Sequence, residues 1–119
     1  KDTEIYIVDT YGETKSFFKI CKTVFLGGSI INHGGQNPLE PARFGCKVIH
    51  GPNVQNFSEV YKLLDQNNLS SRFKNANQLV KLVNQSFKQN SNFSNKVIKL
   101  KKIGSNILDH TLSDISYYL

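Results

Sequence analysis

Residues 23–41 read TVFLGGSIINHGGQNPLEP, an apolar segment that leads through two glycine pairs into the start of a helix. The first four residues, 23–26, are β-branched or large and apolar, which predicts a buried strand that ends at the first glycine pair. Further on, Asn37 suits the N-cap position, Pro38 suits the first helical position, and Glu40 stands three residues after the cap, as in a capping box. The stretch therefore predicts a strand, a glycine-rich loop and a helix in succession.

Strands and helices are predicted to alternate on both sides of this stretch. Short apolar runs predict strands at 5–8, 23–26 and 47–50, with a short edge strand at 71–74. Helical spacing, caps and glycine stops predict helices over 13–21, 38–44, 57–68, 75–87 and 96–112, and the Asn/Ser-rich segment 89–95 is predicted as a loop. Asn75 or Asn77 is expected to cap the fourth of these helices. The alternation favours an α/β fold with parallel strands joined by right-handed crossovers.

The carboxyl edge of such a sheet is where ligands bind, because the loops that follow the strands gather there. Backbone amides beside Gly27 and Gly28, followed by Ser29, can approach an anionic oxygen without a Cβ in the way. The helix that begins after Asn37 would direct its positive N-terminal end at the same place. These residues alone predict a pocket that favours a phosphate or a sugar carboxylate.

Four blocks carry a more specific signal: DTYGE at 9–13, FLGGS at 25–29, HGGQNPLEP at 33–41, and GP at 51–52 followed by NF at 56–57. In order and spacing they resemble the C-terminal domain of the bacterial Kdo transferases, which move 3-deoxy-D-manno-octulosonic acid (Kdo) from its CMP-activated form onto the lipid A precursor of lipopolysaccharide. The blocks cover roughly the first half of the chain. Three positions differ from the usual family residues: Tyr11 replaces Met, Asn32 replaces Pro and Asn53 replaces His.

The resemblance implies a partial Rossmann-like parallel sheet, from the C-terminal domain of a glycosyltransferase with two Rossmann domains (GT-B type). A chain of 119 residues can bury one core. Residues 1–119 are therefore expected to be a portion of the nucleotide-sugar-binding domain, without the N-terminal domain and the first strands of this domain. The implied activity is Kdo transfer in lipopolysaccharide biosynthesis, with this chain supplying the donor-binding part and being inactive when isolated.

The resemblance also implies which residues contact CMP-Kdo. They are Gly12, Glu13, Gly28, Ser29, Asn37, Glu40 and Asn56. Glu40 is expected to hold both ribose hydroxyls, a task suited to a two-oxygen acceptor, and Gly28 with Ser29 to approach the CMP phosphate or the Kdo carboxylate. Structural alternatives stay open: a capping-box role for Glu40, helix caps at Glu13, Asn37 and Asn56, and a tight turn at Gly28 and Ser29.

No catalytic residue is expected in this chain. His33 lies in the glycine-rich loop, where an imidazole could titrate near neutral pH. The resemblance, however, places the base on a glutamate of the N-terminal domain, so His33 is expected to order the loop or to contact the ligand. Cys21 and Cys46 lack the spacing of a zinc site, and the histidines are scattered, so no metal and no cofactor is expected.

The net charge of +6 comes entirely from residues 61–119, because residues 1–60 hold six Lys/Arg and six Asp/Glu. A cluster of lysines stands on the last predicted helix: Lys96, Lys99, Lys101 and Lys102. The cluster is interpreted either as a solvated face or as a contact for anionic lipid head groups or a phosphorylated acceptor. Nucleic acid is not an expected partner, because the chain has only two arginines and no aromatic-rich basic motif.

The partners implied by the resemblance are the CMP-Kdo donor, the lipid A precursor as acceptor, and a possible complementing N-terminal polypeptide. The sequence shows no signal peptide and no apolar run of membrane-spanning length. The expected location is the cytoplasmic face of the bacterial inner membrane, with peripheral attachment through the missing N-terminal part. Two alternatives remain, a UDP-sugar glycosyltransferase of the same fold and a non-catalytic remnant.

Overall fold

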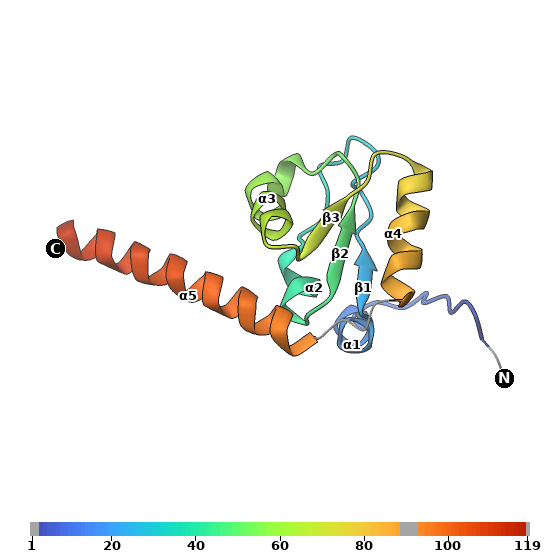
Figure 1. The fold of residues 1–119 in the computed structure, drawn as a ribbon, viewed down its shortest axis with the longest axis horizontal. Helices are drawn as coiled ribbons and strands as arrows, with labels where there is room; N and C mark the ends of the chain where they lie inside the picture. Colours follow the sequence, from blue (N-terminus) through green and yellow to red (C-terminus); the bar gives the residue numbers. More distant parts are fainter. Residues whose placement is uncertain (1–2, 89–92, 119) are drawn as a thin grey trace.

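The computed structural model describes residues 3–88 and 93–118, which form an α/β fold (Figure 1). The elements in chain order are α1 (Thr14–Ile20), β1 (Thr23–Phe25), α2 (Leu39–Arg43), β2 (Lys47–His50), the 3-10 helix η1 (Gln55–Phe57), α3 (Ser58–Gln66), β3 (Ser70–Arg72), α4 (Ala76–Lys88) and α5 (Phe93–Tyr118). The predicted alternation of helices and strands is confirmed over residues 14–88.

The three strands form a parallel sheet in the order β1-β2-β3, so β2 is the central strand. Thr23 pairs with Lys47 in β2, and Ile49 of β2 pairs with Ser71. The helices α2 and α3 cover one face of the sheet, and α4 covers the other (Figure 1). This arrangement confirms the predicted α/β class with parallel strands, and it places the loops that follow β1 and β2 at the same edge.

The hydrophobic core lies between the sheet and the α2/α3 layer. It consists of Ala42, Val48, Tyr61, Leu64 and Leu69. Side chains alternate along a strand, so Val48 points to this core while its neighbour Ile49 points to the α4 face. Both are buried, which is the burial expected of a central strand in a parallel sheet. β2 therefore packs against helices on both faces of the sheet.

Local signals explain where two helices begin and end. The side chain of Asn75 accepts a hydrogen bond from the amide of Gln78 at 3.0 Å, and the side chain of Gln78 accepts one from the amide of Lys74 at 2.8 Å. This reciprocal pair identifies Asn75, and not Asn77, as the cap of α4. At the end of α2, Gly45 adopts a positive φ of 83°, which is the predicted left-handed stop.

The predicted strand at residues 5–8 is wrong, because this segment has no regular secondary structure and lies outside the sheet. Ile5 and Ile7 are 81% and 83% exposed. A strand is stable only when its backbone groups pair with a neighbour, and the described residues place no strand beside this segment. The apolar pattern favours a strand, but the pattern cannot supply the partner that a strand needs.

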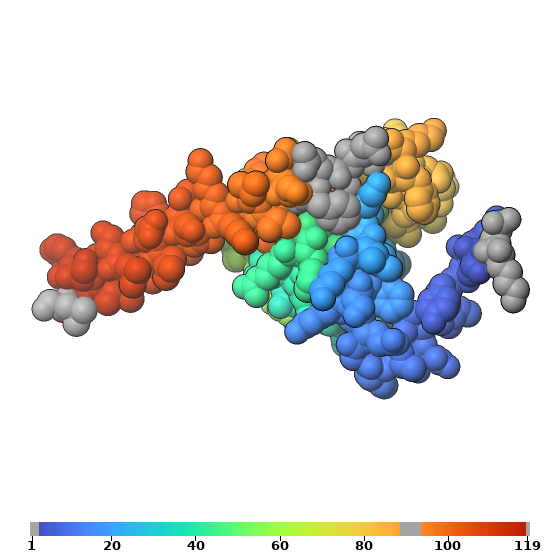
Figure 2. Space-filling view, turned by 90° about the horizontal axis from the view of Figure 1, so that it is seen from below, coloured from blue at the N-terminus to red at the C-terminus, as the bar shows by residue number. Residues whose placement is uncertain are grey.

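The last helix is longer than predicted. α5 already includes residues 93–95, which were predicted as loop, and it continues past residue 112 to Tyr118; residues 89–92 lie outside the described part. Its first turns contact α2, and the Lys99 ammonium donates to the carbonyl of Asn67 at 2.8 Å. Its distal half projects away from the body (Figures 1 and 2). Among the described helices, none is both long and apolar enough to cross a bilayer.

Candidate functional site

Two loops meet at the carboxyl edge of the sheet. The glycine loop, residues 26–37, follows β1, and the β2 loop, residues 51–56, follows the central strand. Because β1 and β2 are parallel neighbours, both loops leave the sheet at the same edge and lie side by side. The hydrogen bonds between them decide which groups remain available for a ligand.

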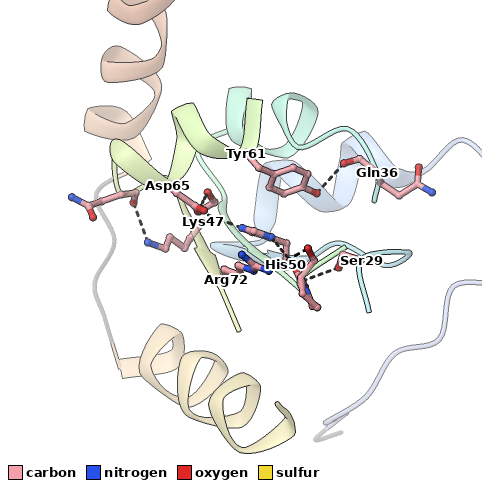
Figure 3. A network of polar contacts seen from close by, with 11 residues as sticks. Ser29, Gln36, Lys47, His50, Tyr61, Asp65 and Arg72 are labelled. Carbon is pink, nitrogen blue, oxygen red and sulfur yellow. Dashed lines mark hydrogen bonds and ion pairs between the residues drawn. The ribbon is translucent and has the colours of Figure 1, made fainter. Parts of the chain in front are cut away.

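Ser29 is the first link between the two loops, and it is fully buried. Its hydroxyl donates to the Leu26 carbonyl at 2.7 Å and accepts from the Gly51 amide at 2.9 Å (Figure 3). Its carbonyl accepts from the Asn53 amide at 2.9 Å. A Cβ at Gly51 would lie 2.3 Å from that same carbonyl oxygen, so only glycine fits there. The Ser29 hydroxyl has its partners inside the protein and the residue has no exposed surface, so its ligand contact remains a prediction.

Asn56 is the second link. Its amide donates to the Gly34 carbonyl at 3.1 Å, and its side chain donates to the His33 carbonyl at 3.3 Å. Gly34 has a φ of +97°, and a Cβ there would lie 2.2 Å from the Asn56 side-chain nitrogen. The helix-cap reading of Asn56 is wrong, since Asn56 lies within η1 and makes no cap bond. The side chain instead holds the glycine loop, and its ligand contact stays a prediction.

Gly28 closes the glycine loop on itself. Its carbonyl accepts from the amide of Gly35 at 3.1 Å, and both glycines have a positive φ, +70° and +77°. A Cβ on Gly28 would lie 3.0 Å from the ring of His33, which shows that His33 packs across this turn. Within the described part of the chain, the amides of Gly28 and Ser29 donate no hydrogen bond. Ser29 is fully buried, so only the amide of the half-buried Gly28 is open to an anionic oxygen.

Glu40 lies beside this loop, in the first turn of α2. The N-cap position of α2 is Pro38, one residue later than predicted, and it makes no side-chain cap bond. The side chain of Asn37 accepts from the Leu39 amide at 3.0 Å. The return bond of a capping box, in which the Asn37 amide would donate to the Glu40 carboxylate, is not formed. Glu40 is exposed, and its carboxylate accepts no hydrogen bond from the residues that the structure describes. The carboxylate is therefore available to two neighbouring hydroxyls of a ligand.

Tyr61 of α3 makes a hydrogen bond to the glycine loop, a contact that was not predicted from the sequence. The sequence shows Tyr61 only as one apolar position of an amphipathic helix. Its buried hydroxyl donates to the Gln36 carbonyl at 2.9 Å (Figure 3). Burial and the nearby Asp65 charge raise the pKa of Tyr61 to about 12, so the hydroxyl stays a donor. A signal did exist, because a buried tyrosine hydroxyl usually finds a hydrogen-bond partner.

A second polar contact was also missed in the sequence. His50, at the end of β2, is buried, and its ring lies 4.3 Å from that of Tyr61, centroid to centroid. One ring nitrogen is 2.8 Å from the Gly51 carbonyl, and the other is 3.4 Å from a carboxylate oxygen of Asp65 (Figure 3). The Ser70 hydroxyl donates to the same oxygen. Burial alone would raise the pKa of Asp65, but the hydrogen bonds from His50 and Ser70 outweigh it and lower the pKa below its usual value.

The structure does not bring Gly12 and Glu13 to this edge. Glu13 begins α1, which lies at the opposite end of β1, where that strand starts (Figure 1). The side chain of Glu13 accepts from the Thr10 hydroxyl and caps no helix amide. The expected position at the carboxyl edge depended on a strand at residues 5–8. Because that segment does not join the sheet, the turn that follows it is not carried to the site.

The comparisons with known proteins agree with this geometry. The chain is 33% identical over 119 residues to the 3-deoxy-D-manno-octulosonic acid transferase of Rickettsia typhi, which covers 98% of this chain and 24% of the relative. It is 39% identical over 64 residues to the protein of the same name from Haemophilus influenzae, which covers 54% of this chain and 15% of the relative. The chain is a homologue of the Kdo transferases. No profile of a known protein family matches it.

The fold of this Kdo transferase homologue matches a solved structure as well. It superposes with a TM-score of 0.73 on the C-terminal CMP-Kdo binding domain of WaaA from Acinetobacter baumannii, with 24% identity, over 85% of this chain and 53% of that one. The resemblance drawn from the four sequence blocks and the expected fold are thus confirmed. The chain spans about a quarter of the length of its Rickettsia typhi relative.

Proposed function

We propose that this Kdo transferase homologue is the donor-binding part of an enzyme that transfers Kdo from CMP-Kdo to the lipid A precursor. The observation that carries the proposal concerns two groups that make no hydrogen bond to the described residues: the exposed carboxylate of Glu40, in the first turn of α2, and the amide of Gly28, in the glycine loop that leads into α2. A carboxylate with two oxygens suits a pair of ribose hydroxyls, and an unpaired amide suits a phosphate or a sugar carboxylate. Nucleotide and acidic sugar are the two parts of CMP-Kdo.

The rest of the loop supports this role by being preorganised. Ser29, Asn56 and Tyr61 tie the glycine loop to the β2 loop and to α3 through groups that do not need a ligand. A loop that is already ordered loses less conformational freedom on binding. The candidate site therefore has a fixed backbone, with the Glu40 carboxylate and the Gly28 amide as its functional groups.

Transfer itself requires a base, and none of these residues is assigned that role. A base must reach within about 3 Å of the acceptor proton in a productive complex. We place it on the part of the enzyme that the relatives contain beyond this chain, and we place the acceptor reaction at the cytoplasmic face of the inner membrane. The chain alone is then expected to show no Kdo transfer, and a polypeptide that supplies the other domain is expected to restore it.

The proposal is tested by titrating the 119-residue chain with CMP, UMP and AMP in a calorimeter. CMP is expected to bind more tightly than the other two nucleotides. Glu40→Gln is expected to weaken CMP binding about 10- to 150-fold, which corresponds to the loss of charge-assisted hydrogen bonds worth about 1.5–3 kcal/mol. The matched control is Glu59→Gln, because Glu59 is also an exposed glutamate in the first turn of a helix.

Each other outcome favours a different function. Tighter binding of UMP with the same dependence on Glu40 favours a UDP-sugar transferase of the same fold. Absence of nucleotide binding in a folded sample favours a non-catalytic remnant. Equal loss of affinity in Glu40→Gln and Glu59→Gln would show that general electrostatics, and not a ribose contact, explains the effect.

A further inference from the structure

A second polar cavity lies away from the glycine loop, on the α4 face of the sheet. Its volume is about 100 Å³, and it is bounded by all three strands, α4 and the first turns of α5. Its polar lining consists of Thr23, Lys47, Ser71, Gln85, Ser86 and Lys96. Thr23 and Lys47 are paired neighbours on β1 and β2, near the amino ends of the strands. The cavity is thus separate from the proposed donor site.

Two cations face this cavity without a counter-ion. Lys47 comes from β2 and Lys96 from α5, and no carboxylate in the described part of the chain lies within ion-pair distance of either. Residues 89–92 are Gln-Asn-Ser-Asn, so they add no carboxylate. Burial lowers the pKa of both amines, and the charge of Lys96 lowers that of Lys47 further. The two positive charges are therefore held close together at a cost that an anion would relieve.

The nearby groups that could neutralise these lysines are not available. The charge of Asp65 raises the pKa of Lys47 from beyond ion-pair distance. Its carboxylate, however, already accepts hydrogen bonds from His50 and Ser70. Burial raises the pKa of Cys46, beside Lys96, to about 11, so this thiol is neutral near pH 7. The Lys47 ammonium donates one bond, to the Asn68 carbonyl at 3.0 Å (Figure 3). An ammonium group has three donors, and two of them remain.

Neutral donors complete the lining. The hydroxyls of Thr23 and Ser71 and the amide of Gln85 make no hydrogen bond to any residue that the structure describes. Two ammonium groups with hydroxyl and amide donors, and no carboxylate acceptor, form a donor-rich set that matches an oxyanion. The volume equals that of roughly three water molecules in the liquid, which is enough for one small tetrahedral anion but not for a lipid head group with its chains.

We propose that this cavity binds one free tetrahedral oxyanion of the phosphate class. The anion bridges Lys47 of the sheet and Lys96 of α5, and Ser71 and Gln85 donate to its remaining oxygens. It thereby joins α5 to the body of the domain and stabilises the folded chain in proportion to its concentration.

The test is a titration of the whole 119-residue chain with sodium phosphate, followed by amide NMR, with sodium chloride at the same ionic strength as reference. Phosphate is expected to give saturable shifts at the amides of Ser71 and Ser86, and chloride is expected to give none. Lys96→Gln is expected to weaken this binding about tenfold or more. Lys102→Gln is the matched control, because it removes an exposed lysine from the same helix.

The outcomes separate this site from the donor site. Shifts confined to Gly28 and its neighbours would place phosphate at the glycine loop only and overturn the second site. Equal shifts with chloride, or equal weakening in both lysine variants, would show simple charge screening and overturn it as well. Glycerol 3-phosphate is expected to bind more weakly than phosphate, and tighter binding would overturn the assignment to a free anion in favour of a head group. Circular dichroism of Lys96→Gln checks that the variant is folded, and the comparison of salts on the unmodified chain does not depend on any variant.

Discussion

The loop that follows β1 and the turn that precedes α1 both carry a glycine motif after an apolar run. Of the two, only the loop after β1 is fixed by hydrogen bonds to a distant part of the described chain. The glycine loop is tied to the β2 loop through Ser29 and Asn56. The turn at Gly12 has local contacts only, such as the Thr10–Glu13 hydrogen bond and the ring contact between Tyr6 and Phe17 at 6.3 Å. A motif thus acquires a defined geometry only where a neighbouring strand delivers a second loop beside it.

The central strand explains this difference. β2 is buried on both faces, and it ends in the residues that fix the β2 loop. Its neighbour β1 therefore gains both a hydrogen-bonding partner and a loop to pack against. Residues 5–8 gain neither, and their apolar side chains stay in water. Three substitutions test this contrast between a supported region and an unsupported one.

The largest effect is expected for Gly51→Ala in the β2 loop. The new Cβ would lie 2.3 Å from the Ser29 carbonyl oxygen, so the backbone of one loop must move. We expect the free energy of unfolding to fall by about 1–3 kcal/mol, the usual cost of overpacking, in urea denaturation. Gly104→Ala is the control, because its Cβ meets open space and alanine favours a helix. Equal stability of the two variants would contradict the close fit of the loops.

A smaller effect, dependent on pH, is expected for Asp65→Asn. The pKa of Asp65 is lowered in the folded chain, so its contribution to stability is complete above the unfolded pKa and is lost as the pH falls through the folded pKa. We expect the unmodified chain to lose stability below about pH 4, and the variant to lose less over that range. Thermal unfolding from pH 7 to pH 3 measures the difference. Asp109→Asn, on the exposed face of α5, serves as control. An equal loss of stability in the unmodified chain and in both variants would show that Asp65 does not cause the pH dependence.

The smallest effect is expected for Ile7→Ser in the unsupported segment. Ile7 is 83% exposed, so its replacement removes little buried apolar surface. We expect the free energy of unfolding to change by less than about 0.5 kcal/mol, as for ordinary surface substitutions. Ile49→Ser provides the contrast, because Ile49 is buried in β2. A large loss of stability in Ile7→Ser, measured by the same urea denaturation, would show that residues 5–8 pair with another strand in solution.

The sequence by itself determined the alternation of strands and helices over residues 14–88, the left-handed stop at Gly45 and an asparagine cap at the start of α4. These features depend on contacts within a few residues, such as the bond from the Gln78 amide to the Asn75 side chain. Apolar spacing likewise identified the buried helix face that contains Tyr61 and Leu64. The resemblance to the Kdo transferases, now confirmed by the relatives, was also carried by local blocks of residues.

Only the tertiary structure decided which side chains were left free for a ligand. The sequence could not tell whether Glu40 would close a capping box, whether Asn56 would cap a helix, or whether the Ser29 hydroxyl would be satisfied inside the protein. Each answer depends on a partner at least three residues away, and for Ser29 the partner at Gly51 belongs to a different loop. The same holds for residues 5–8, since strand pairing is a property of two segments and an apolar pattern describes one. Local chemistry therefore determined the elements, and the long-range pairing of polar groups decided the site.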